Sequence, residues 1–140
     1  MSGHPWDTHD AMSQANVETI RRGFEHFEAT GEPIWDDFAE TIEIRDHQSP
    51  DQGYYVGHDG WRSWISDWSA AWTDWNVEVE EIVEAGESVL VLIHHTARGS
   101  STGLDLDSHD GILYGFRQGE VVTLDYYTGR EQALEAAGLT

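Results

Sequence analysis

The sequence predicts one α+β domain in which helices cover a curved, mostly antiparallel sheet around an apolar pocket. Apolar residues recur at helical spacing in the first half of the chain. The second half holds alternating or continuous apolar runs that are typical of strands, separated by Gly-containing turns. Helices followed by a meander of strands make an α+β domain, and 140 residues suit a single domain.

We expect residues 1–12 to form a flexible arm and residues 13–140 to form the domain. The first segment lacks periodicity and contains Gly, Pro, His and Asp. A helical pattern begins at Ser13, and its apolar stripe consists of Val17, Ile20, Phe24 and Phe27. Gly31 and Pro33 end this helix, and residues 34–38 predict a short second one.

The middle of the chain predicts a strand, a turn and a third helix. Residues 41–45 alternate and are β-branched, residues 48–53 form a turn, and residues 54–56 are extended. The third helix begins at Gly57. Its wide aromatic stripe consists of Trp61, Trp64, Ile65, Trp68 and Trp72.

Four strands and a final helix are predicted after Trp75, where the apolar period changes to two. The first strand begins near Val77, and a turn follows at residues 85–88. Residues 89–93 are continuously apolar, as expected of a strand buried on both faces, and this strand runs on to Thr96. Residues 104–117 and 121–128 form the last two strands, joined by a tight hairpin, and residues 130–137 form a helix.

The charge of the chain excludes several classes of partner. Asp and Glu total 27 against seven Arg and no Lys, which gives a net charge of −20. Such a charge repels nucleic acids and anionic membranes. The acidity fits either a solvated surface that resists aggregation or adaptation to high salt, and the missing Lys also fits a GC-rich genome in which Arg replaces Lys. The chain has no Cys, no apolar run of membrane-spanning length and no secretory signal pattern, so we expect a cytoplasmic protein.

Several segments resemble the SnoaL-like branch of the nuclear-transport-factor-2-like superfamily. They are residues 16–27 (NVETIRRGFEHF), 42–46 (IEIRD), 85–89 (AGESV), 114–122 (YGFRQGEVV) and 127–139 (YTGREQALEAAGL). The resemblance implies a cone-shaped, cystatin-like α+β barrel with an apolar pocket, often packed as a homodimer through its sheet. Its relatives include polyketide cyclases, ketosteroid isomerases, dehydratases, epoxide hydrolases and many proteins without catalytic activity, so the fold alone does not assign a function.

Asp46 is the first candidate for chemistry. It ends the first predicted strand, where the resemblance implies the base of ketosteroid-isomerase-like enzymes; the alternative is a solvated turn residue. The oxyanion-binding residues of those enzymes are not matched, because Phe24 and Ile112 stand at their positions. Steroid isomerisation of that kind is therefore not expected.

The alternation of strand residues selects three further candidates. If Ile112 and Tyr114 face the pocket, Asp110 does so too, and Tyr126 shares that face on the last strand. Only one residue of the pair His94–His95 can face inward, and we prefer His94. The alternatives are a hydrogen-bonded core histidine, a solvated carboxylate and a tyrosine that only forms wall.

Three functions remain open at this stage. One is a cofactor-free acid/base enzyme of cyclase, isomerase or dehydratase type, with Asp46 as base, acting on a small, largely apolar cyclic or polyketide-like molecule. The second is a non-catalytic domain that binds such a molecule, and the third is an interaction module that dimerises through the sheet face and has a vestigial pocket. In the first two, we expect a ligand-binding wall made of Phe24, Trp35, Trp61, Trp64, Trp68, Ile112 and Tyr114.

We expect no metal and a homodimer. The acidic cluster at residues 105–110 lacks the Gly and the terminal Glu of a calcium loop, and adjacent histidines on a strand point apart. The homodimer would form through the outer face of the sheet. The residues expected on that face are Leu113, Thr123, Asp125 and Tyr127.

Overall fold

The computed structural model describes residues 7–47, 53–99 and 103–139. Three helices, a short 3₁₀ helix and six strands follow one another along this part of the chain. They are α1 (Asp7–Thr30), η1 (Trp35–Asp37), β1 (Phe38–Asp46), β2 (Gly53–Val56), α2 (Gly57–Ala71), β3 (Trp72–Ala85), β4 (Ser88–Gly99), β5 (Asp105–Arg117), β6 (Glu120–Tyr127) and α3 (Arg130–Ala136). The predicted α+β class is confirmed, whereas the predicted turn over residues 48–53 lies mostly outside the described residues.

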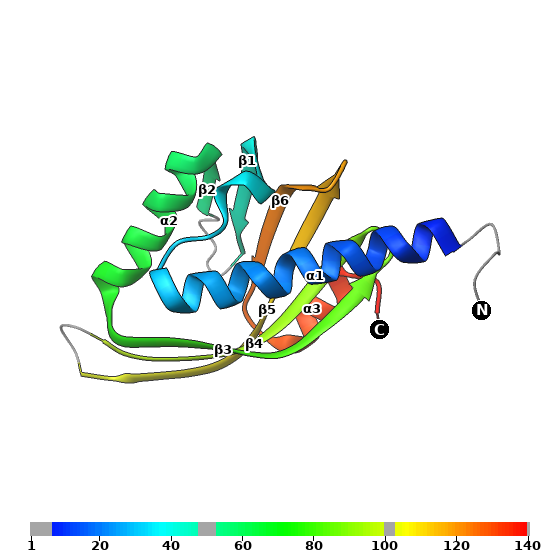
Figure 1. The fold of residues 1–140 in the computed structure, drawn as a ribbon. Coiled ribbons are helices and arrows are strands. Elements are labelled where there is room, and N and C mark those ends of the chain that lie inside the picture. The colour runs from blue at the N-terminus through cyan, green and yellow to red at the C-terminus, as the bar shows by residue number, and fades with distance from the viewer. Residues whose placement is uncertain (1–6, 48–52, 100–102, 140) are drawn as a thin grey trace.

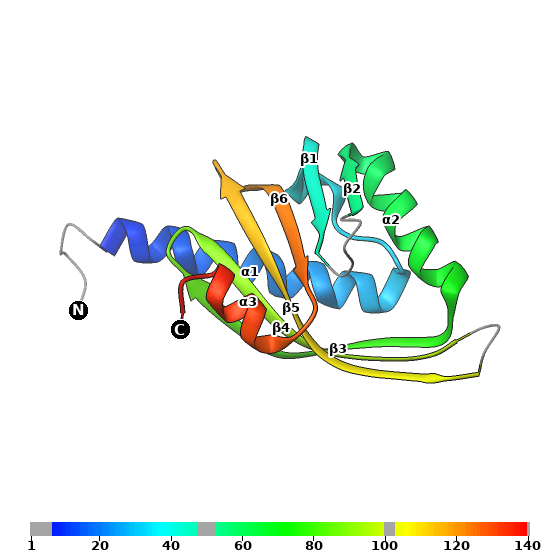
Figure 2. The ribbon, with the colours of Figure 1, turned by 180° about the vertical axis from the view of Figure 1, so that it is seen from behind.

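The six strands form one open, curved sheet in the order β2-β1-β6-β5-β4-β3. Neighbouring strands are antiparallel except β1 and β6, which pair in parallel. Helix α1 crosses one face of the sheet and α2 stands beside its β1–β2 end (Figure 1). Helix α3 lies on the opposite face (Figure 2). The two longer helices therefore pack on one face of the sheet and α3 packs on the other.

Helix α1 begins at Asp7, earlier than the expected start at Ser13. Residues 7–12 are thus helical, although we expected them in the arm. No Gly or Pro follows Pro5 before residue 23, and acidic residues near a helix N-terminus interact favourably with the helix dipole. None of the described helices is long and apolar enough to cross a lipid bilayer.

Strand β3 begins at Trp72, five residues before the predicted start. Trp72 therefore leaves the helical stripe, and Trp75 becomes a strand residue. The pairing of β3 with β4 shifts between Thr73 and Asn76, and Asp74 between them has a positive φ of 52°. Trp75 and Val77 are half-buried on either side of the exposed Asn76, so the alternation from Val77 extends back to Trp75 and breaks only at Asp74.

Strand β4 serves two cores, as its continuous apolar run predicts. Its alternate residues Val89, Val91 and Ile93 belong to the large core under α1 and α2. Leu90 and Leu92 belong to a smaller core on the opposite face, under α3. All five side chains are buried.

Helix α3 packs closely on the outer face of the sheet because β5 carries a glycine beneath it. A Cβ atom placed on Gly111 would lie 2.2 Å from Cβ of Ala133, which is fully buried on α3. Leu113 and Tyr127 pack against the same small core. Part of the face that we expected to present to a second copy is thus covered by the chain's own helix.

Candidate functional site

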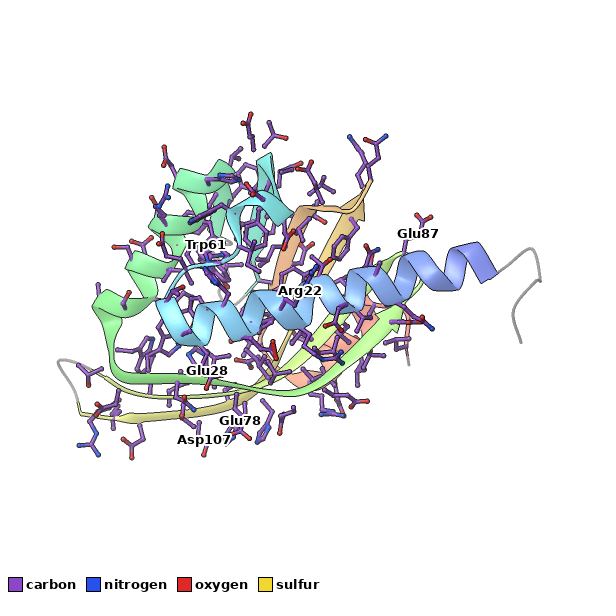
Figure 3. All side chains as sticks on the ribbon, viewed as in Figure 1. Arg22, Glu28, Trp61, Glu78, Glu87 and Asp107 are labelled. Carbon is purple, nitrogen blue, oxygen red and sulfur yellow. The ribbon has the colours of Figure 1, made fainter. Side chains whose placement is uncertain are left out.

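A cavity of about 90 Å³ lies between α1, α2 and the concave face of the sheet. At ~10–15 Å³ for each water, this is room for about six to nine water molecules, or for a molecule of one or two rings. Most of its lining is apolar, and Trp61 reaches it from α2 (Figure 3). The aromatic members of the wall are Phe24, Phe27, Phe38, Trp61, Trp64, Trp68, Trp75, Tyr114 and Tyr126.

Trp35 is the one expected wall residue that does not line this cavity. The remaining six, namely Phe24, Trp61, Trp64, Trp68, Ile112 and Tyr114, do so. Trp35 packs behind the wall, with its ring 5.4 Å from that of Trp61 in an edge-on arrangement. The guanidinium carbon of Arg62 lies over the Trp35 ring, 4.4 Å from its centroid. Trp35 starts the three-residue helix η1, which is too short to show which side its residues would face.

Wall residues that the sequence did not single out come mainly from α1 and β3. Phe27 belongs to the predicted stripe of α1, so that stripe already identified it as an inward-facing residue. Trp75 was not assigned because the predicted strand began near Val77, although the same alternation, continued back by two residues, places Trp75 on the face of Val77. Gly23 of α1 also lines the cavity, and a Cβ atom there would have nothing within 4 Å.

Three of the four expected catalytic side chains lie together at one end of the cavity. Asp46 of β1 is the register partner of Tyr126 on β6, and Tyr126 is the register partner of Ile112 on β5. Asp110 lies two residues before Ile112 on the same face, and its carboxylate accepts a hydrogen bond from Tyr126. Tyr126 lines the cavity itself, whereas both carboxylates lie just behind the wall.

The preference for His94 is wrong: His95 faces the cavity and His94 lies on the outer face. His95 is 1% exposed, and it continues the inward alternation of Val91 and Ile93 along β4. His94 instead bonds Asp107 on the other side of the sheet. The apolar run at residues 89–93 is buried on both faces, so it could not indicate which histidine points inward.

His95, Tyr126 and Asp110 form a directed hydrogen-bond chain that begins at Trp75. The indole N–H of Trp75 donates to Nε2 of His95, since an indole nitrogen can only donate. Nδ1 of His95 lies 3.1 Å from the Tyr126 hydroxyl and donates to it, because the single proton of that hydroxyl goes to Asp110. That hydroxyl in turn donates to Oδ2 of Asp110 at 2.5 Å.

Asp110 is held as an anion by three hydrogen-bond donors and by the neighbouring ring of His95. Tyr126 donates to Oδ2, the hydroxyl of Ser108 donates to Oδ1 at 2.6 Å, and the backbone N–H of Gly129 donates to the same oxygen at 3.0 Å, while Nδ1 of His95 lies 3.9 Å from Oδ2. Burial raises the pKa of Asp110, but these hydrogen bonds outweigh it and lower the pKa to about 2. Asp110 is therefore a weak base that organises its neighbours.

Tyr126 stays a neutral phenol at physiological pH. Burial is the largest cause that raises the pKa of its hydroxyl, followed by the charge of Asp110 and the hydrogen bond to it; the charge of Asp46 acts in the same direction. The hydroxyl already donates to Asp110 and accepts from His95. A ligand oxygen would have to displace one of these partners to gain a proton donor there.

Asp46 contacts the cavity through two tryptophans. Its Oδ2 accepts the indole N–H of Trp64 at 2.8 Å and that of Trp68 at 3.3 Å, and both indoles line the cavity. Asp46 itself is buried. The carboxylate thereby fixes the orientation of two rings of the wall and adds a negative charge to the polar end of the cavity.

The family of the chain follows from comparison with known proteins. The family model of the SnoaL-like domain matches residues 8–124. A putative SnoaL-like polyketide cyclase from Jannaschia sp. CCS1 is 19% identical, with 100% of this chain and 98% of that chain covered and a TM-score of 0.70. TerC, co-crystallised with polyporic acid, is 16% identical over 89% of this chain and 98% of its own, with a TM-score of 0.68.

A third solved structure shares the fold with a different ligand. A hypothetical protein with a ketosteroid isomerase-like fold from Catenulispora acidiphila DSM 44928, in complex with trimethylamine, is 17% identical. The alignment covers 76% of this chain and 81% of that chain, with a TM-score of 0.60. No curated protein sequence matches the chain. The family model covers most of the chain and the solved structures share its fold, so the protein belongs to the SnoaL-like domain family.

Proposed function

We propose that the protein binds a small, largely apolar molecule of one or two rings inside this cavity. The observation that carries the proposal is that the polar side chains at one end of the cavity already form hydrogen bonds with one another. His95, Tyr126 and Asp110 already satisfy one another, while the rest of the wall is mostly aromatic or aliphatic. Such a wall favours flat apolar ligands by burial and ring contact. The ligands polyporic acid and trimethylamine in two neighbours of the same fold support a small-molecule pocket.

Gly23 offers a test that fills the cavity without disturbing the wall. A leucine at this position of α1 would enter open space, since a Cβ atom there meets nothing within 4 Å. We expect 1-naphthol and 1-tetralone, two-ring probes, to quench the fluorescence of the lining tryptophans and to give a saturable calorimetric isotherm. Gly23→Leu should weaken binding of both probes at least tenfold.

Gly23→Ala is the matched control, because it adds one methyl group and leaves most of the cavity open. It should bind both probes with nearly the affinity of the wild type. Equal affinity in all three proteins would show that the probes bind elsewhere, and the cavity would then lose its role in the proposal.

A second candidate, cofactor-free acid/base catalysis of cyclase, isomerase or dehydratase type, is favoured by the placement of Asp46. A buried carboxylate beside an apolar cavity is a suitable base for removing a proton next to a carbonyl group. Its substrate would be a cyclic or polyketide-like ketone. In this reading, Asp46 reaches the substrate from behind Trp64 and Trp68 and takes the proton, while the hydrogen bonds that link Trp75, His95, Tyr126 and Asp110 hold Tyr126 at the cavity.

Exchange of carbon-bound hydrogen separates the two candidates without knowledge of the natural substrate. In D₂O, an enzyme that uses Asp46 as base should accelerate deuterium incorporation beside the carbonyl of 1-tetralone, followed by proton NMR. Asp46→Asn keeps the shape of the side chain and should lower this rate about 10²-fold while probe affinity changes less. If the wild type binds 1-tetralone but does not accelerate deuterium incorporation, the catalytic candidate is contradicted and only the binding function stands.

A further inference from the structure

Two histidines and two carboxylates meet on the outer face of the sheet, away from the cavity. His94 on β4 and His109 on β5 are register partners, and their rings stack in parallel with centroids 4.4 Å apart. Asp107, two residues before His109 on the same face, places Oδ1 2.6 Å from Nε2 of His94. Glu80 of β3 places Oε1 3.0 Å from Nδ1 of His109. Three strands thus contribute to one cluster.

The geometry of the cluster is close to that of a metal site. One ligand atom from each of His94, Asp107 and His109 lies within 4.8 Å of the other two. Tetrahedral zinc, with bonds of about 2.0–2.2 Å, needs ligand atoms roughly 3.3 Å apart. Side-chain rotation can supply the difference, because the three side chains are 30%, 68% and 54% exposed and lie on the protein surface.

Glu80 completes the arrangement in a way that metal sites commonly use. A metal-bound histidine usually gives its second ring N–H to a carboxylate, which fixes the ring and raises its basicity. Glu80 is that carboxylate for Nδ1 of His109, so Nε2 is left to bind the ion. Glu78, the register partner of His94, adds negative charge nearby (Figure 3). Arg130, whose charge reaches Glu80, pairs with Glu81.

We propose that His94, Asp107 and His109 bind one divalent transition-metal ion of the Zn²⁺ class, with Glu80 as the residue that orients His109. Two imidazoles and a carboxylate favour Zn²⁺, Co²⁺ or Ni²⁺ over Mg²⁺ and Ca²⁺, which prefer oxygen ligands alone. The ion would replace the direct contact between His94 and Asp107 and would join β4 to β5. No local spacing in the sequence reveals this set, because its members come together only through the register of β4 and β5.

Calorimetric titration of the untagged protein with ZnCl₂, in a buffer that does not bind the metal, tests the proposal. We expect one ion per chain at micromolar or lower Kd and a rise of the melting midpoint, with no saturable heat from MgCl₂ over the same range. The double variant His94→Gln/His109→Gln should weaken Zn²⁺ binding at least tenfold. The control His26→Gln removes an exposed histidine of α1 outside the cluster and should leave the affinity unchanged.

A spectroscopic measurement on the wild type covers the case in which the double variant does not fold. Co²⁺ bound in place of Zn²⁺ should give visible absorption bands of a low-coordinate site that added Zn²⁺ abolishes. Histidine side-chain NMR should show Zn²⁺-dependent shifts of two rings only. Binding of undiminished strength in a folded double variant, shifts confined to other histidines, or the lack of any saturable Zn²⁺ binding would each overturn the proposal.

Discussion

Gly111→Ala should destabilise the protein far more than the addition of one methyl group suggests. The new Cβ atom would lie 2.2 Å from Cβ of Ala133, whereas carbon atoms in contact are about 3.5–4.0 Å apart. Helix α3 would therefore have to move outward by roughly 1.5 Å. It cannot do so without opening the small core that it forms with Leu90 and Leu92.

Overpacking of this size costs about 1–3 kcal/mol. We place the loss of unfolding free energy near the upper end, because Ala133 is fully buried and both atoms in the clash belong to backbone-anchored Cβ positions. For a chain of this length, such a loss lowers the melting midpoint by about 10 °C. Gly23→Ala is the opposite control: the same methyl group enters open space in a helix and should stabilise it by about 0.5–1 kcal/mol.

A double-mutant cycle identifies the cause. Ala133→Gly alone should destabilise through helix propensity and lost burial, at about 1 kcal/mol or more. Combined with Gly111→Ala, it removes one of the two clashing methyl groups, so the double variant should be more stable than the sum of the single effects by at least about 1 kcal/mol. Urea unfolding monitored by circular dichroism gives all four values. Additive effects would refute the packing argument.

Three further predictions concern charge and assembly. Because the pKa of Asp110 is lowered to about 2 in the folded state, its carboxylate stabilises the fold by about 2 kcal/mol above pH 4, and this contribution is lost as the pH falls toward 2. In Asp110→Asn, the free energy of unfolding in urea should therefore change less with pH over this range. With a net charge of −20, the melting midpoint should rise between low and molar NaCl, and a flat or falling midpoint would contradict the self-repulsion argument. We also expect a homodimer through the outer sheet face around Thr123 and Asp125, beside α3; sedimentation as a monomer at micromolar concentration would count against it.

Alternation along the strands predicted which side chains of the last two strands face the cavity. Asp110, Ile112 and Tyr114 share one face of β5 because successive strand residues point to opposite sides. The helical spacing of Trp61, Trp64 and Trp68 likewise places them on one side of α2. In each case the pattern itself contains the direction of the side chain, so no tertiary information was needed.

The remaining features of the fold and of the cavity could not be predicted, because they depend on contacts between segments far apart in the sequence. His94 and His95 could not be distinguished, because the apolar run before them is buried on both faces. The position of α3 depends on Gly111, whose missing side chain gives no periodic signal. The pairing of His94 with His109 and the bond from Gly129 to Asp110 require the strand register, which local patterns do not specify.

The hydrogen bond from the backbone of Gly129 has a consequence for how this fold can diversify. Asp110 holds Tyr126 at the cavity with one oxygen and the start of α3 with the other. A substitution at this position alters both sides of the sheet at once, so selection on the ligand and selection on the outer helix constrain the same residue. Wall residues such as Phe24 or Ile112 do not connect the cavity to helix α3 in this way. New ligand preferences should therefore arise by substitution of the apolar wall residues, while Asp110 is retained.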